Sequence, residues 1–147
     1  MIILLFGISN VGKTTIGKLL CERLHIPFYD LDDEVRRFFG ITLEQFVNTG
    51  TLEDRDRKRG LVLEKILKDG KGKIVAVSPI SYSRYIHQLL RNPGVFPIEL
   101  RDSAENIFDR IVFSDENDKI YTDEQYKQAH KAYWTVKSFH RHSHLEN

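Results

Sequence analysis

Apolar residues along the chain occur in two patterns, as short runs and as longer segments in which they recur every three or four positions. The mostly continuous runs lie at residues 2–6, 26–29, 74–77 and 95–100. An apolar run of this length that ends at a turn is typical of a strand buried on both faces, as in parallel sheets. We therefore predict four strands.

Between these runs, apolar residues spaced three and four apart predict amphipathic helices. In the first of them, Ile16, Leu20 and Leu24 are expected to form the buried face. Threonine followed three residues later by glutamine is the capping-box pattern, which marks a helix start at two further places. The expected helices cover residues 13–24, 53–68, 82–90 and 104–112, with further helices starting at Thr42 and Thr122.

Strands that alternate with helices predict an α/β fold in which helices flank a short parallel sheet. Pro97 lies inside the fourth run and has no N–H to donate, so we expect this strand at an edge of the sheet. No later run predicts another strand, which limits the predicted sheet to four strands. The length of 147 residues suits a single domain over residues 1–147.

Charge and cysteine content narrow the possible functions. The 22 Lys and Arg residues nearly balance the 21 Asp and Glu residues, so no net field attracts nucleic acid or an anionic membrane. No apolar run approaches the roughly 18 residues of a membrane helix. Cys21 is the only cysteine, which excludes an internal disulfide and favours a reducing compartment. We expect a cytoplasmic monomer or homodimer without nucleic-acid or membrane partners.

The segment after the first predicted strand carries the clearest functional motif. Residues 7–14 read Gly-Ile-Ser-Asn-Val-Gly-Lys-Thr and fit the phosphate-loop pattern Gly-x-x-x-x-Gly-Lys-Ser/Thr. A buried strand before the motif and a helix after it are the context that such a loop requires. The alternative is a tight strand-to-helix turn in which these residues occur by chance. A guanine-reading Asn-Lys-x-Asp motif is missing, which disfavours a GTPase.

Each fixed position of the motif has a physical role in holding a triphosphate. The glycines let consecutive backbone N–H groups point at one phosphate, at the positive end of a helix dipole. Lys13 supplies a charge for the β and γ oxygens, and the Thr14 hydroxyl suits Mg²⁺. We predict ATP and Mg²⁺ as ligands, with nucleotide contacts from Gly7, Ser9, Asn10, Val11, Gly12, Lys13, Thr14 and Thr15.

Two aspartates follow the second predicted strand, near the sheet edge where the loop lies. Ligands of open α/β sheets bind beyond the carboxyl ends of the strands. In an extended chain, Asp30 and Asp32 point to the same side. Two carboxylates beside a phosphate suit one that holds Mg²⁺ through water and one that accepts a proton from a substrate hydroxyl. The alternative is that these aspartates cap a helix.

Taken with these motifs, the chain resembles the shikimate kinase family. The resemblance rests on Gly-x-Ser-x-Val-Gly-Lys-Thr-Thr-Ile-Gly-Lys-Leu-Leu and on the later Ile-Pro-Phe-Tyr-Asp-Leu-Asp-Asp, and it is strongest over residues 2–68. It implies a three-layer P-loop kinase fold with a lid at about residues 113–122. It also implies transfer of the ATP γ-phosphate to a hydroxyl of a small carboxylated ring.

The resemblance further implies roles for three residues. Asp30 matches the aspartate associated with Mg²⁺, and Asp32 matches the one that orients the accepting hydroxyl. Arg55 matches the arginine that binds the substrate carboxylate, a task for which a guanidinium fork is well suited. The alternative for Arg55 is a surface ion pair within the charged residues 53–59.

Several segments depart from the family pattern. Where the family has Gly-Gly-Gly, residues 78–81 read Ser-Pro-Ile-Ser, and Ser78 either donates its hydroxyl to the substrate or caps a helix. The lid residues 114–119 are acidic and include no arginine, so Arg110 or Lys119 would have to close over the phosphates. The family's second carboxylate-binding arginine and its fifth strand have no counterpart.

Two hypotheses follow from different classes of protein. The first is an ATP-dependent small-molecule kinase with shikimate as the best single acceptor and a gluconate-kinase-like enzyme as the alternative. Its catalytic residues would be Lys13 and Asp32, and its acceptor contacts Asp32, Arg55 and Ser78. The second is a nucleotide-binding module with little transferase activity that regulates a partner, because the missing lid arginine and glycines are parts on which turnover depends.

Overall fold

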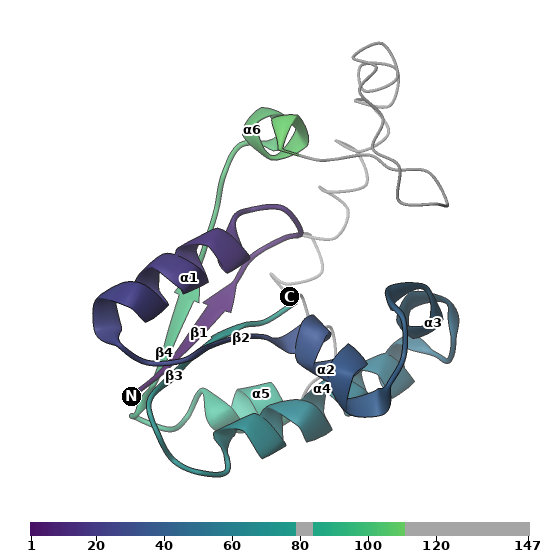
Figure 1. The fold of residues 1–147 in the computed structure, drawn as a ribbon, viewed down its shortest axis with the longest axis horizontal. Coiled ribbons are helices and arrows are strands. Elements are labelled where there is room, and N and C mark those ends of the chain that lie inside the picture. Colours follow the sequence, from purple (N-terminus) through teal and green to yellow (C-terminus); the bar gives the residue numbers. More distant parts are fainter. Residues whose placement is uncertain (79–83, 111–147) are drawn as a thin grey trace. The chain divides into compact units, whose positions relative to one another are not determined.

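A computed structural model describes residues 1–78 and 84–110 of the chain, which divides into two compact units, Met1–Leu100 and Arg101–Asn147. The described part of the second unit contains helix α6 (Ala104–Asp109). The first unit contains, in chain order, β1 (Ile2–Phe6), α1 (Lys13–Leu24), β2 (Phe28–Asp30), α2 (Leu31–Phe39), α3 (Leu43–Asn48), α4 (Leu52–Leu67), β3 (Lys73–Ala76), α5 (Arg84–Leu89) and β4 (Val95–Glu99) (Figure 1).

The strands form one parallel sheet in the order β2-β3-β1-β4. Leu4 in the central strand β1 lies beside Val75 of β3 on one side and beside Pro97 of β4 on the other. Within the described residues β4 is therefore an edge strand, where a residue without an N–H is tolerated. These findings confirm the predicted α/β class, the parallel sheet of four strands and the edge position of the strand with Pro97.

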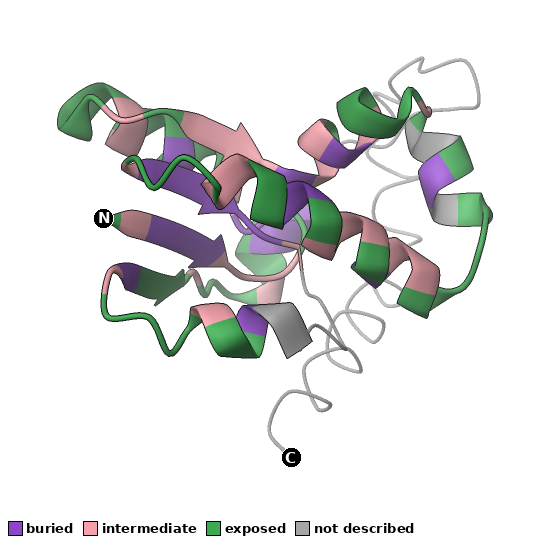
Figure 2. Ribbon diagram, turned by 90° about the horizontal axis from the view of Figure 1, so that it is seen from below, coloured by how far each residue is buried: buried purple, intermediate pink, exposed green. Residues whose placement is uncertain are grey.

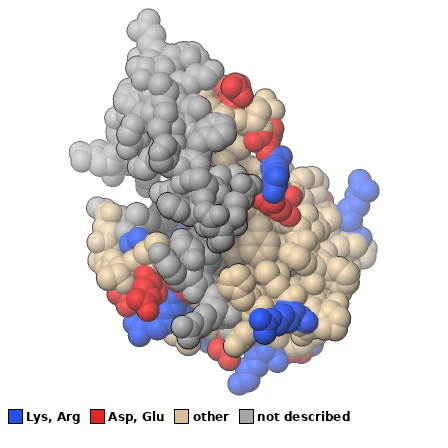
Figure 3. Space-filling model, turned by 180° about the vertical axis from the view of Figure 1, so that it is seen from behind, with Lys and Arg blue, Asp and Glu red and all other residues tan. Residues whose placement is uncertain are grey.

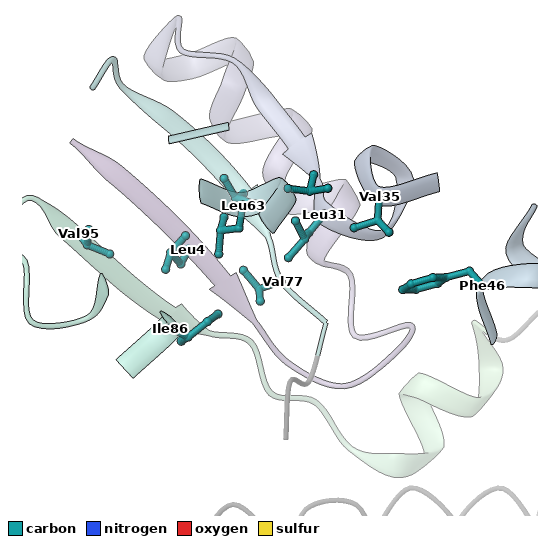
Figure 4. Close-up of a cluster of buried hydrophobic side chains, with 10 residues drawn as sticks. Leu4, Leu31, Val35, Phe46, Leu63, Val77, Ile86 and Val95 are labelled. Atoms are coloured by element: carbon teal, nitrogen blue, oxygen red, sulfur yellow. The ribbon is translucent and has the colours of Figure 1, made fainter. Parts of the chain in front are cut away.

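Both faces of the sheet are covered, and each has its own hydrophobic core. On one face the buried residues Ile3, Leu5 and Ile74 pack with Leu20 and Cys21 of α1. On the other face, side chains from the strands meet those of α2 to α5 (Figure 4). Figure 2 shows that β1 and β3 are largely buried, whereas β2 is half-buried and β4 is mostly exposed, so the expected burial on both faces does not extend to β4. The members of the larger cluster are Leu4, Leu31, Val35, Phe46, Val62, Leu63, Val75, Val77, Ile86 and Val95.

The buried face of α1 differs from the prediction. Ile16 is 37% exposed and Leu24 is 41% exposed, whereas Gly17 is buried. The reason is the close approach of the helix to β2, because a Cβ added at Gly17 would lie 2.2 Å from Cε2 of Phe28. Only a residue without a side chain allows this approach, so the face that contacts the sheet runs through Gly17 and Leu20.

The aspartates at the end of β2 mark the start of a helix that the apolar pattern does not predict. The chain is extended only as far as Asp30, which caps α2 by accepting from the N–H groups of Asp32 and Asp33 (3.2 and 3.5 Å). Asp32 lies in the first turn of α2. The prediction that Asp30 and Asp32 point to the same side of an extended chain is therefore wrong, and the capping alternative is confirmed for Asp30.

Capping boxes begin both α3 and α4. Thr42 and Gln45 form the box predicted at the start of α3. Thr51 and Asp54 form a second box at the start of α4, which the sequence pattern misses because it requires Glu or Gln at the last position. The hydrogen bonds from the backbone and side chain of Thr51 lower the pKa of Asp54. Both boxes satisfy backbone N–H groups at the helix start.

Some predicted features lie outside the described residues, namely Ser81, Lys119, the lid at about residues 113–122 and the helix starting at Thr122. None of the described helices combines the length and apolar character needed to span a bilayer. On the face shown in Figure 3, the described basic and acidic side chains are interspersed and form no single basic field. This distribution agrees with the balanced charge of the sequence.

Candidate functional site

The loop between β1 and α1 has a tightly curled backbone (Figure 1). Gly7, Asn10 and Gly12 have positive φ angles of 141°, 63° and 105°. Glycine adopts such angles without steric cost, and asparagine tolerates the left-handed region better than most residues. Gly7 also approaches the chain after β4, since an added Cβ would come within 2.6 Å of the Leu100 carbonyl oxygen. The shape of the loop therefore requires glycine at both motif positions.

Lys13 lies inside this curl. Its Nζ donates to the carbonyl oxygens of Gly7 and Ile8, at 2.7 and 2.8 Å. Burial lowers the pKa of Lys13 below its ordinary value of 10.5, and the nearby carboxylates of Asp30 and Asp32 partly offset that effect. The ammonium group is thus hydrogen-bonded to the loop and attracted by two acidic side chains, and phosphate oxygens would further stabilise its charge.

The other motif residues divide into exposed and buried positions. Ser9, Asn10, Thr14 and Thr15 are exposed, so their polar groups are open to a ligand. Val11 is buried, and its N–H donates to the carbonyl oxygen of Ile8 (3.4 Å). The side chain of Val11 therefore helps to fold the loop. The contacts of all these residues with a nucleotide stay predictions.

Thr14 and Asp30 bring together oxygen atoms that suit a magnesium ion. The Thr14 hydroxyl donates to Oδ2 of Asp30 (3.1 Å), while Oδ1 of Asp30 accepts from the start of α2. Mg²⁺ usually keeps several waters and combines one or two carboxylates with the phosphates of its nucleotide. In the described part of the chain, no group of three or more His, Cys, Asp or Glu side chains could hold a metal. The pair fits a nucleotide-bound ion better than a protein-only metal site.

Asp32 is the centre of a second cluster, to which three elements contribute. Its Oδ1 accepts from Nε of Arg59 on α4 (2.8 Å), and its Oδ2 accepts from the hydroxyl of Ser78, which follows β3. Arg59 also donates to Asp56 (3.2 Å), and its guanidinium carbon lies 4.9 Å from the ring centre of Phe46. Because the side chains of Arg59 and Asp56 are 11% and 5% exposed, this charge network is largely buried.

Sequence reasoning missed Arg59. A weak signal exists, since Arg59 follows Arg55 by four residues and therefore lies on the same helix face. However, the mixed charge of residues 53–59 is typical of a solvated helix. The pattern therefore gives no indication that Arg59 and Asp56 are buried as a pair. The contact between Arg59 and Asp32 joins residues 27 positions apart. No local pattern encodes a pairing over that distance.

Two predicted arginines lie in different units of the chain. Arg55 is half-buried on α4, one turn before Arg59. Arg110 follows α6 in the second unit, where it donates to Asp102 (2.6 Å). Hydrogen bonds from Asn106 and then Arg110 lower the pKa of Asp102 to about 2. The roles of Arg55 in binding an acceptor and of Arg110 in binding the nucleotide stay predictions.

The parallel sheet and the phosphate loop together define a P-loop kinase fold. Solved structures of kinases are similar to this chain and support that fold. The shikimate kinase from Acinetobacter baumannii in complex with shikimate matches with a TM-score of 0.68 at 23% identity, over 92% of this chain and 74% of that chain. The shikimate kinase from Aquifex aeolicus matches with a TM-score of 0.61 at 21% identity, over 96% and 83%. A gluconokinase from Sinorhizobium meliloti matches with a TM-score of 0.57 at 18% identity, over 95% and 73%.

Sequence similarity identifies the family. The family profile described as shikimate kinase matches residues 9–146, so the chain belongs to the shikimate kinase family. The shikimate kinase of Caldicellulosiruptor bescii is 32% identical over 109 residues, which cover 74% of this chain and 63% of the relative. That of Brucella canis is 36% identical over 70 residues, which cover 47% and 34%. The chain thus spans less than two thirds of the length of these curated relatives.

Proposed function

We propose that this protein is an ATP-dependent phosphotransferase that transfers the γ-phosphate to a hydroxyl of a small anionic metabolite, with shikimate as the first candidate. The observation that carries the proposal is the complete phosphate loop, with Lys13 folded into it and with Thr14 hydrogen-bonded to the carboxylate of Asp30. A cation for the phosphates and a carboxylate for the acceptor are the two groups that this reaction needs. Membership of the family supports the same reaction.

On the nucleotide side, the N–H groups between Gly7 and Gly12 would surround a phosphate, with the loop already curled for that purpose. Lys13 would exchange the carbonyl oxygens of Gly7 and Ile8 for β and γ oxygens of ATP. Thr14 and Asp30 are the residues that would hold Mg²⁺. When bound, this ion neutralises negative charge on the phosphates.

On the acceptor side, Asp32 would accept a hydrogen bond from the acceptor hydroxyl and align its oxygen with the γ-phosphate. Arg55 would bind the acceptor carboxylate with two parallel hydrogen bonds. The similar structure from Acinetobacter baumannii, which contains shikimate, supports that acceptor. Gluconate also combines hydroxyls with a carboxylate, and a gluconokinase shares the fold, so gluconate is the second acceptor to test.

A nucleotide-binding module with little transferase activity is the second candidate function. One observation favours it, because the hydroxyl of Ser78, which is expected to contact the acceptor, donates to Asp32 in the structure. The sequence adds that residues 78–81 lack the family's glycines and residues 114–119 include no arginine. Such a module would bind ATP and act on a partner protein.

A coupled ADP-release assay separates these candidates. The full chain is incubated with Mg-ATP and, in separate reactions, with shikimate, gluconate and nucleoside monophosphates, while ATP binding is measured by calorimetry. ADP release that depends on shikimate or gluconate supports the kinase. ATP binding without acceptor-dependent release supports the module, and a chain that binds no ATP excludes both.

We also propose that residues 1–147 act as one kinase domain in the cytoplasm, as a monomer or homodimer without nucleic-acid or membrane partners. The balance of 22 basic and 21 acidic residues and the single cysteine Cys21 support this setting. Light scattering on the eluate of a size-exclusion column tests the assembly. A mass larger than that of a dimer would contradict it.

A further inference from the structure

We propose that Arg59, together with Ser78, is a positioning residue that fixes the plane of the Asp32 carboxylate so that Asp32 can align the acceptor hydroxyl, a role that rests on the proposed phosphotransfer. The two donors approach different oxygens, since Nε of Arg59 reaches Oδ1 at 2.8 Å and the Ser78 hydroxyl reaches Oδ2. A carboxylate held at both oxygens cannot rotate about its terminal bond without losing a hydrogen bond. Its orientation is therefore set before the acceptor arrives.

Although Arg59 and Ser78 hold it, Asp32 can still accept a hydrogen bond from an acceptor hydroxyl. A carboxylate offers about four lone-pair directions on its two oxygens, and Arg59 and Ser78 use one on each oxygen. The side chain of Asp32 is also 27% exposed, so a ligand can reach it. One acceptor hydroxyl can therefore still donate to Asp32 while both protein donors stay in place.

Arg59 itself is held firmly enough to serve as a fixed point. Its Nη1 donates to Asp56, its guanidinium stacks on the buried ring of Phe46, and its side chain is 11% exposed. The guanidinium fork engages Asp32 and Asp56 through different nitrogens, a geometry that a lysine cannot reproduce. The contacts of Arg59 thus join α2, α3 and α4 around Asp32, the residue that would accept a hydrogen bond from the acceptor.

Loss of the contact between Arg59 and Asp32 should reduce turnover without reducing nucleotide binding. Replacement by Arg59→Met should lower kcat about 100-fold, because a small misplacement of a reacting group costs about that factor. The ATP dissociation constant should change less than about threefold, and Arg59→Lys should recover only part of kcat. Arg57→Met is the matched control, since Arg57 lies on the same helix with its side chain 72% exposed and should leave kcat unchanged.

The decisive measurement repeats Arg59→Met in an Asp32→Asn background. If Arg59 acts through Asp32, the second substitution should change the residual kcat less than about threefold. A further 100-fold loss in that background would overturn the inference, because Arg59 would then act independently of Asp32. A wild-type kcat in Arg59→Met would overturn it as well.

Ser78→Ala provides a second variant that leaves no buried charge unpaired, in case Arg59→Met does not fold. It should lower kcat about tenfold in the wild-type background and leave it unchanged in the Asp32→Asn background. Equal losses in both backgrounds would overturn the inference. A wild-type chain without acceptor-dependent turnover would instead overturn the proposed function itself, and the positioning role with it.

Discussion

The nucleotide half and the acceptor half of the candidate site are built by different means. The nucleotide half is one stretch, residues 7–14, in which backbone angles at two glycines and one asparagine create the curl. The acceptor half consists of side chains from α2, α4 and the segment after β3, joined by hydrogen bonds between residues 27 and 46 positions apart. The first half depends on backbone shape, and the second on a charge network that spans the fold.

The basic side chains of the two halves, Lys13 and Arg59, also differ in the groups with which they interact. Arg59 is paired within the protein, with Asp32 and Asp56. Burial lowers the pKa of Lys13, which donates to two neutral carbonyl oxygens of its own loop. A triphosphate would therefore improve the environment of Lys13, whereas Arg59 already pairs with two carboxylates of the protein. We expect nucleotide binding to change the nucleotide half most.

The largest effect in this comparison should come from Lys13→Ala. Loss of the ammonium group should lower kcat/KM at least about 1,000-fold, because charge on the transferred phosphate would lose the cation that the loop supplies. The acceptor half should keep its structure, so the melting temperature should change little. Lys18→Ala, an exposed position on the same helix, is the control. A loss smaller than tenfold in the ADP-release assay would show that the loop does not hold the triphosphate.

Gly7→Ala tests whether backbone shape carries the nucleotide half. The φ angle of 141° and the Leu100 oxygen 2.6 Å from an added Cβ leave no room for a methyl group. ATP affinity should fall about 30-fold and the free energy of unfolding by about 2–3 kcal/mol. At Gly60 on α4, an added Cβ meets nothing within 4 Å. Gly60→Ala should therefore leave ATP affinity unchanged and raise the free energy of unfolding by about 0.5–1 kcal/mol, because alanine favours a helix more than glycine does. Unchanged affinity in Gly7→Ala would refute the backbone account.

Arg55→Ala tests the acceptor half alone. Loss of a bidentate contact to the acceptor carboxylate should raise the acceptor KM about tenfold or more. The ATP dissociation constant should stay within about twofold of the wild-type value. Arg57→Ala is the control on the exposed side of α4. If Arg55→Ala has no effect on the acceptor KM, the assignment of the acceptor site is wrong.

The pH dependence of ATP binding should sharpen the contrast between the two cations. Since burial lowers the pKa of Lys13, this group loses its proton at a lower pH than an ordinary lysine with a pKa of 10.5. The protonated form binds phosphate, so ATP affinity should fall several-fold as pH rises toward that value. Calorimetry from neutral pH to about pH 10 measures the decline. In Lys13→Arg the charge persists, and a parallel decline there would assign the effect to another group.

The smallest effect should come from Asn10→Gly. Asn10 is exposed and has a φ angle of 63°, which glycine adopts at no steric cost. If the loop acts through its backbone, the ATP dissociation constant should change less than about twofold. A tenfold loss would instead show that the Asn10 side chain itself contacts the nucleotide.

The nucleotide half is also the part that sequence predicts best, because its determinants are consecutive. The positions of Gly7, Gly12, Lys13 and Thr14 follow from one short pattern and from the strand and helix around it. Strands β1 and β3 are predictable for a related reason, since burial on both faces leaves a continuous apolar run. The edge position of β4 is also predictable, because Pro97 has no N–H to donate to a second neighbouring strand.

Other features depend on residues that meet only in the fold. The inward face of α1 is decided by the approach of Phe28 to Gly17, and periodicity alone selects Ile16 instead. Helix α2 begins where Asp30 caps it, a signal indistinguishable in sequence from a pair of functional carboxylates. From the sequence, Arg59 is expected at the surface, whereas in the fold it contacts Phe46 and Asp32.

If this chain moves phosphate from ATP to a small anionic acceptor, the phosphate itself can be followed with a label. The full chain is mixed with Mg²⁺, ATP labelled at the γ-phosphate and shikimate, and the label is traced in the products. We predict label on shikimate in an amount equal to the ADP formed, and none with Lys13→Ala. Bound ATP without any label transferred to shikimate or gluconate would show that the chain is not a kinase for these acceptors.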